Sequence, residues 1–127
     1  MMSNSSNGIA NNKQRIKIVG IGGAGGKFVN MMISKGVADV EFIAINTDKP
    51  ALNISNANIK IQIGKRMYVG HVSAKQELAR RAAEEDYESI QNALTGSDVV
   101  FLLAGLGGNT GSGVTPVVAE IIKKSAT

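Results

Sequence analysis

The chain has 127 residues, 43% apolar and 19% charged, which is typical of a globular protein of one domain or part of one. The absence of Cys excludes disulfides and thiolate metal sites, and a single His excludes a metal site built from a His cluster. The net charge of +4 comes from scattered basic residues, and three Phe and two Tyr without Trp argue against a nucleic-acid partner.

Residues 1–13 are rich in Asn and Ser and contain no apolar stretch. They lack the core of a signal peptide and are predicted to form a disordered arm. No apolar run approaches the length that crosses a membrane. We therefore expect a cytoplasmic protein without direct membrane insertion, whose ordered domain covers residues 14–127.

Strand and helix patterns alternate along this domain. Residues 15–21 (RIKIVGI) form an apolar, β-branched run typical of a strand buried on both faces. Residues 25–35 repeat apolar side chains (Phe28, Met31 and Met32) at helical spacing, and Gly36 ends this helix. The elements predicted next are a strand at 40–45, a short helix from 50 to about 55 and a half-exposed strand at 58–63.

The longest predicted helix begins at a capping box formed by Ser73 and Gln76 and ends at Gly96. Residues 98–104 (DVVFLLA) are predicted to be a strand buried on both faces, and 114–124 a last helix with Pro116 in its first turn. The long helix has an apolar stripe of Leu78, Ala82, Ala83, Tyr87, Ile90 and Leu94, and ion pairs of Arg80 with Glu84 and Arg81 with Glu85.

This alternation predicts an α/β fold with three layers, in which helices cover both faces of a doubly wound, mainly parallel sheet. The sequence stops just past the last helix without a following strand. Such a sheet would keep one uncovered edge strand, so we expect a truncated domain.

Two glycine-rich runs each lie between an apolar strand and a helix. They are residues 20–26 (GIGGAGG) and 105–113 (GLGGNTGSG). Because glycine has no Cβ atom, backbone amides in such runs can approach an anion closely, and the following helix N-terminus adds partial positive charge. Two runs in one small domain predict a clamp for a polyphosphate.

Two other nucleotide motifs fit less well. A Walker A loop requires a glycine and a Ser or Thr at positions that Ile21 and Phe28 occupy. The dinucleotide fingerprint Gly-x-Gly-x-x-Gly is met by residues 20–25, with Asp48 close to the end of the second strand. A Rossmann dinucleotide-binding domain is nevertheless the weaker alternative, because it gives the second run no role.

Three motifs in order resemble the tubulin/FtsZ family of GTPases. Residues 107–113 (GGNTGSG) are similar to the family signature, 20–26 to its first phosphate loop and 44–48 (AINTD) to its second loop. The resemblance covers residues 14–126. It implies a GTP- or GDP-binding domain with Mg²⁺, from a family whose members polymerise head to tail with GTP in bacterial cell division.

The resemblance also implies which residues bind the nucleotide. The first run would offer amides to the α- and β-phosphates, and the second, with the Thr110 and Ser112 hydroxyls, to the β- and γ-phosphates. Asp48 would lie near the γ-phosphate and hold Mg²⁺ through water. The implied binding residues are Gly22, Gly23, Ala24, Gly25, Gly26, Lys27, Asn46, Thr47, Asp48, Gly107, Gly108, Asn109, Thr110, Gly111, Ser112 and Gly113.

The sequence departs from the family pattern at four places. Lys27 stands where Asn is usual, Asn109 replaces the third glycine of the signature, and Pro50 replaces a usual Gln. Residues 70–76 lack the Gly-Ala-Gly-x-x-Pro pattern that covers the γ-phosphate in the family. In the family, base contacts and an acidic catalytic loop come from segments beyond the signature helix, and the acidic loop acts on the next subunit's nucleotide. We therefore assign no catalytic residue and expect little or no GTP hydrolysis by this chain alone.

A second hypothesis comes from a different class of function. The chain would be a non-catalytic assembly module that docks onto the end of a filament of full-length family members and caps it. Under both hypotheses its partners are FtsZ-type filament subunits, and no nucleic acid is involved.

Overall fold

The computed structural model describes residues 14–65, 76–105 and 109–125. The predicted arm at 1–13, Ser73 of the capping box and the site residues Gly107 and Gly108 lie outside these ranges. The described elements are, in chain order, β1 (Ile16–Ile21), α1 (Gly22–Ser34), β2 (Glu41–Asn46), α2 (Lys49–Asn53), β3 (Ile59–Gln62), α3 (Gln76–Glu85), α4 (Tyr87–Leu94), β4 (Val99–Ala104) and α5 (Asn109–Ser125).

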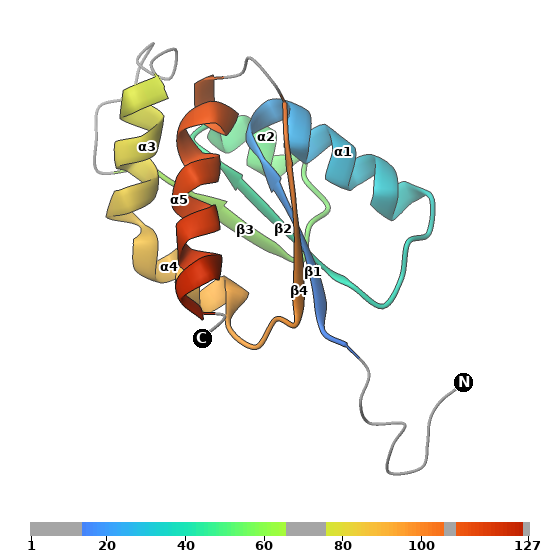
Figure 1. The fold of residues 1–127 in the computed structure, drawn as a ribbon. Helices are drawn as coiled ribbons and strands as arrows, with labels where there is room; N and C mark the ends of the chain where they lie inside the picture. Colours follow the sequence, from blue (N-terminus) through green and yellow to red (C-terminus); the bar gives the residue numbers. More distant parts are fainter. Residues whose placement is uncertain (1–13, 66–75, 106–108, 126–127) are drawn as a thin grey trace.

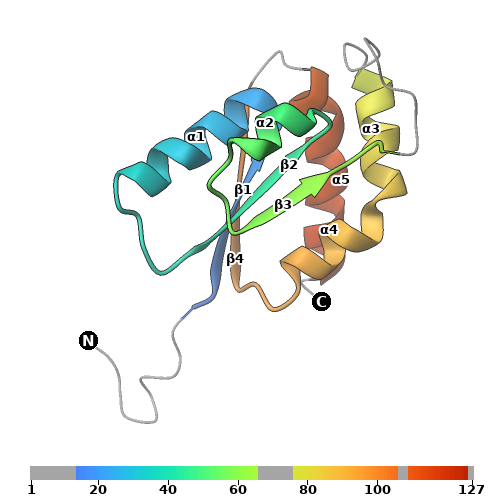
Figure 2. The same ribbon diagram turned by 180° about the vertical axis from the view of Figure 1, so that it is seen from behind.

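The four strands form one parallel sheet in the order β3-β2-β1-β4. Helices α1 and α2 cover one face, and α3, α4 and α5 cover the other (Figure 1; Figure 2). The predicted three-layer, mainly parallel architecture is confirmed. Because the strands are parallel, their carboxyl ends all lie at one edge of the sheet.

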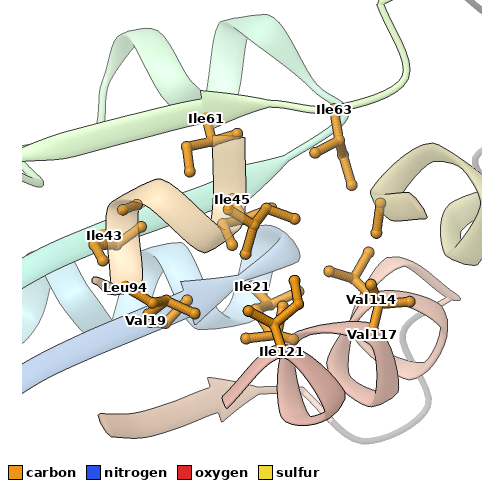
Figure 3. Close-up of a cluster of buried hydrophobic side chains, with 14 of the residues drawn as sticks. Val19, Ile21, Ile43, Ile45, Ile61, Ile63, Leu94, Val114, Val117 and Ile121 are labelled. Carbon is orange, nitrogen blue, oxygen red and sulfur yellow. The ribbon is translucent and has the colours of Figure 1, made fainter. Parts of the chain in front are cut away.

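The larger core lies between the sheet and α3, α4 and α5 (Figure 3). Side chains alternate between the two faces of a strand, so every second residue of β1 and β2 reaches this core. Val19, Ile21, Ile43 and Ile45 are at most 1% exposed. The opposite face has a smaller core, formed by Ile18, Phe42, Ala44, Val29, Leu52 and Ala57.

The prediction of one continuous helix that ends at Gly96 is wrong, because Asp86 divides this segment into α3 and α4. The Asp86 carboxylate accepts a hydrogen bond from the amide of Gly64, just beyond β3, at 3.2 Å. This contact from outside the helix favours a break at a residue of low helix propensity. The predicted stripe is confirmed at its centre, where Ala82 and Ile90 are fully buried.

Strand β4 is not buried on both faces, contrary to the prediction. Within the described ranges it pairs only with β1, as the expected uncovered edge strand would, and Phe101 is 52% exposed. Only part of the apolar pattern predicted for α1 reaches the core, where Met32 is partly buried. Phe28 and Met31 are 51% and 43% exposed, and Val29 enters the core instead.

No helix in the described part of the chain combines the length and the apolar character needed to cross a membrane.

Candidate phosphate-binding site

The two glycine-rich runs meet at the carboxyl edge of the sheet, because the strands that precede them are neighbours. Ile21 at the end of β1 is paired with Ala104 at the end of β4. Figure 1 shows α1 and α5 beginning at this same edge. A Cβ atom placed on Gly22 would lie 3.5 Å from Cβ of Thr110 and 3.6 Å from the amide nitrogen of Gly111. The runs are therefore side by side, as a shared ligand would require.

Both runs enter their helices earlier than predicted. Helix α1 begins at Gly22 rather than at residue 25, and α5 begins at Asn109 rather than at 114. Gly22, Gly23 and Gly25 thus lie in the first turn of α1, and Gly111 lies in the first turn of α5. Pro116 falls inside α5, where no amide bonds the carbonyl four residues before it. First-turn amides have no partner within a helix, so each run still presents unpaired donors.

Gly22 makes the sharp entry from β1 into α1. Its φ of +75° is in the left-handed region that favours glycine. Ile21, at the cap position of α1, makes no side-chain cap hydrogen bond. The first amides of α1 are therefore left without the side-chain acceptor that a Ser or Asp at this position would provide.

Some glycines of the runs are required for packing. A Cβ on Gly25 would collide with the carbonyl oxygen of Leu103, and one on Gly20 would lie 2.5 Å from the carbonyl oxygen of Gly25. A Cβ on Gly105 would lie 2.7 Å from Cβ of Ala24. These contacts hold α1 against β1 and β4, so this group of glycines positions the site by close packing.

Gly23 and Gly26 differ from that group. A Cβ on either would meet nothing within 4 Å, so their backbone faces open space. Both line a hollow of about 80 Å³ between α1 and α2, which Lys27 and Asn46 also line. An anion could reach the backbone here, and a side chain at either glycine would occupy the same space.

The second loop reaches this hollow through Asn46, and Thr47 and Asp48 follow it in the chain. Asn46 is only 6% exposed, and its Oδ1 accepts a hydrogen bond from the amide of Asp48 at 3.2 Å. The carbonyl of Thr47 accepts a hydrogen bond from Nε2 of Gln62 at 3.5 Å. The Asp48 side chain is exposed and makes no hydrogen bond or ion pair among the described residues. It remains available to a water or a hydrated cation.

The second run contributes differently from the first. Gly111 and Gly113 are buried, and a Cβ on Gly111 would lie 3.2 Å from Cβ of Ala104. Thr110 and Ser112 are half-buried, and in the described ranges their hydroxyls make no hydrogen bond. Among the residues of this run that the structure describes, the hydroxyls and first-turn amides of α5 are therefore groups that a ligand could use.

A protein-only metal site is not present in the described part of the chain, which has no group of three or more acidic or His side chains. Among the predicted site residues that the structure describes, Asp48 offers the only carboxylate. A Mg²⁺ ion would thus need phosphate oxygens and water for its other ligands, which is how this ion usually binds with nucleotides.

Asn30 shapes the hollow and was not among the predicted residues. Its Nδ2 donates to the carbonyl of Ile54 at 3.1 Å, and its Oδ1 accepts from the amide of Asn56 at 2.8 Å. It thereby ties α1 to the segment after α2. No local pattern signals this role, because the partners are more than twenty residues away.

Comparisons with known proteins show what the whole chain is similar to. The sequence model of the tubulin/FtsZ family, GTPase domain, matches residues 15–127. An empty FtsZ dimer from M. jannaschii is similar at 40% identity and a TM-score of 0.86, over 92% of this chain and 34% of that chain.

Two further solved structures are similar. CetZ2 from Haloferax volcanii, in a GTPγS-bound protofilament, is 30% identical with a TM-score of 0.74, over 87% of this chain and 36% of that one. TubZ of Clostridium botulinum phage c-st is 26% identical with a TM-score of 0.72, over 86% of this chain and 36% of that one. The chain spans about a third of the length of the solved chains that it matches.

Proposed function

The chain belongs to the tubulin/FtsZ family, and we propose that it binds the phosphates of a guanine nucleotide at the carboxyl edge of its sheet. The observation that carries this proposal is the contact between the two runs, with Gly22 against Thr110 and Gly111. Two helix N-termini with unpaired amides converge there, and each favours negative charge. A single run of this kind would be a weaker argument, because it could be only a tight turn.

In this proposal the two runs hold different parts of the phosphate chain. The first turn of α1 donates amides to the α- and β-phosphates, where Gly23 and Gly26 leave room for the oxygens. The first turn of α5, with the hydroxyls of Thr110 and Ser112, donates to the β- and γ-phosphates. Asp48 binds a Mg²⁺ ion through water, and the bound ion would supply neutralising charge to the phosphates.

We further propose that the protein acts in the cytoplasm as a head-to-tail filament subunit in cell division. The dimeric M. jannaschii FtsZ and the GTPγS-bound protofilament of the H. volcanii relative support self-association. The described residues include no group of three or more carboxylate or His side chains that could hold a metal ion. We accordingly expect this chain alone to hydrolyse little or no GTP.

Retention of labelled nucleotide by the folded chain at micromolar concentration tests the proposal. We expect GTP and GDP to be retained, with Mg²⁺ favouring GTP, and unlabelled inorganic triphosphate to compete because the runs contact phosphate. Circular dichroism establishes that the chain is folded in the same buffer. A folded chain that retains neither nucleotide would refute the proposed site.

A further inference from the structure

Lys27 is a cation at the hollow that forms no ion pair with any residue that the structure describes. It is exposed on α1, and it lines the same hollow as Gly23, Gly26 and Asn46. Among the described residues its ammonium makes no hydrogen bond or ion pair. Its charge is therefore available to a bound anion without the loss of an existing contact.

Lys17, at the other end of the sheet, is a lysine whose ammonium group has a partner for each of its hydrogen-bond donors. Its ammonium lies 3.2 Å from Oε1 of Glu41 and donates to the carbonyls of Ala93 and Thr95 at 2.7 and 3.2 Å. All three of its donors are in use. Lys27 has the same donors and uses none of them within the described ranges.

The proposed ligand creates an electrostatic problem at this edge. A triphosphate carries several negative charges, and the carboxylate of Asp48 adds another beside the γ-phosphate. Repulsion between such charges is strong when they lie a few ångströms apart and partly shielded from water. A divalent cation removes that repulsion, and so does any fixed cation within reach of the phosphate oxygens.

From this arrangement we propose that Lys27 is a built-in cation of the site. Its ammonium binds nucleotide phosphates and thereby lowers the dependence of nucleotide binding on Mg²⁺. The inference rests on the proposed nucleotide binding. It gives a role to the lysine at a position where Asn is usual in the family. Lys27 would matter most without Mg²⁺, because the ion neutralises the same oxygens when it is present.

Three variants separate the charge of Lys27 from other effects. Lys27→Gln removes the charge and keeps most of the side chain's length. Lys27→Arg keeps the charge. Lys35→Gln removes another exposed charge, at the carboxyl end of the same helix, away from the hollow. Thermal unfolding should be unchanged in all three, because neither lysine side chain has a partner among the described residues.

Calorimetric titration with GTP, in excess Mg²⁺ and in EDTA, tests the inference. We expect Lys27→Gln to weaken binding about tenfold in EDTA and about twofold in Mg²⁺. Lys27→Arg should stay within about twofold of the parent in both buffers, and Lys35→Gln should match the parent. A larger loss in EDTA than in Mg²⁺ is a result that a merely structural role would not produce.

Two results would overturn the inference while leaving the proposed function intact. One is parent-like binding by Lys27→Gln in EDTA, and the other is an equal loss in both buffers. Failure of the folded parent chain to bind GTP in either buffer would overturn the proposed function and the inference together.

Discussion

At the amino-terminal end of the sheet, charged side chains contact other residues, whereas several polar side chains near the carboxyl ends of β1 and β4 face open space. Lys17 bridges β1 to Glu41 and to the last turn of α4. The main chain of Arg15 donates to the Asp98 carboxylate at 2.7 Å and accepts from the amide of Asp98 at 2.8 Å. Polar groups at this end are used to hold strands and helices together.

The carboxyl end has the opposite arrangement. Lys27, Thr110 and Ser112 have side chains without partners in the described part of the chain, and Gly23 and Gly26 expose bare backbone. Each end is built from strand termini of the same sheet, so the difference is not one of fold. In our proposal, the amino-terminal end stabilises the domain, and the unpaired groups at the carboxyl end are those that bind the ligand.

The largest expected effect is on folding. Gly25→Ala would place a Cβ against the carbonyl oxygen of Leu103 and close to the backbone of Gly20. Neither backbone can move without separating α1 from the sheet, so we expect a loss of about 3 kcal/mol in the free energy of unfolding. Urea denaturation measures this loss. An unchanged midpoint would show that the packing contact is not needed.

Lys17→Met should be the next most costly change. It leaves the carbonyls of Ala93 and Thr95 without their charged donor, and we expect a loss of about 2 kcal/mol. Nucleotide affinity should stay unchanged while the variant is folded, because Lys17 lies at the other end of the sheet. Lys60→Met, at an exposed position on β3, is the matched control and should shift stability by less than about 0.5 kcal/mol.

Gly23→Ala should weaken nucleotide binding without lowering stability, the reverse of what we expect for Lys17→Met. The new methyl group meets nothing in the protein and sits in a helix, so stability should hold or rise by about 0.5 kcal/mol. The same methyl would crowd the phosphates, and we expect GDP affinity to fall about tenfold, equal to about 1.4 kcal/mol. Calorimetry and urea denaturation on one sample measure both. Unchanged affinity would remove Gly23 from the site.

The smallest effect is expected at Arg80, which belongs to neither end of the sheet. A hydrogen bond to Glu77 and the charges of Glu77 and Glu84 raise its pKa. A raised pKa on a cation means that its contribution is lost only at strongly alkaline pH, so Arg80 adds no pH dependence of stability near neutrality. Arg80→Gln should lower the melting temperature by no more than about 2 °C at any pH from about 6 to 9. A larger shift would mean that surface pairs contribute more than this comparison assumes.

Patterns local in sequence predicted most of the fold. Alternating apolar strands and helices, with stops at Gly36 and Gly96, correspond to the observed elements, and both glycines have positive φ. What failed depends on contacts between distant residues. The break at Asp86 is accompanied by a contact with Gly64, and the exposure of Phe101 depends on which residues pack over that face of β4. Neither partner can be read from the local sequence.

The candidate site shows the same limit. Its segments were predicted from residue type, and the structure brings the described ones to one edge. Residue type did not separate Gly25, which packs, from Gly23, which faces open space, because the distinction is made by Leu103 on another strand. Asn30 was missed for the same reason, since its partners follow α2.

Amide resonances followed by NMR during a GDP titration test the central claim most directly. The account predicts that the amides of Gly23 and Gly26 in α1 and of Thr110 in α5 shift together with one dissociation constant, while those of Lys17 and Thr95 do not move. A response confined to one run, or the largest shifts at the amino-terminal end of the sheet, would contradict it.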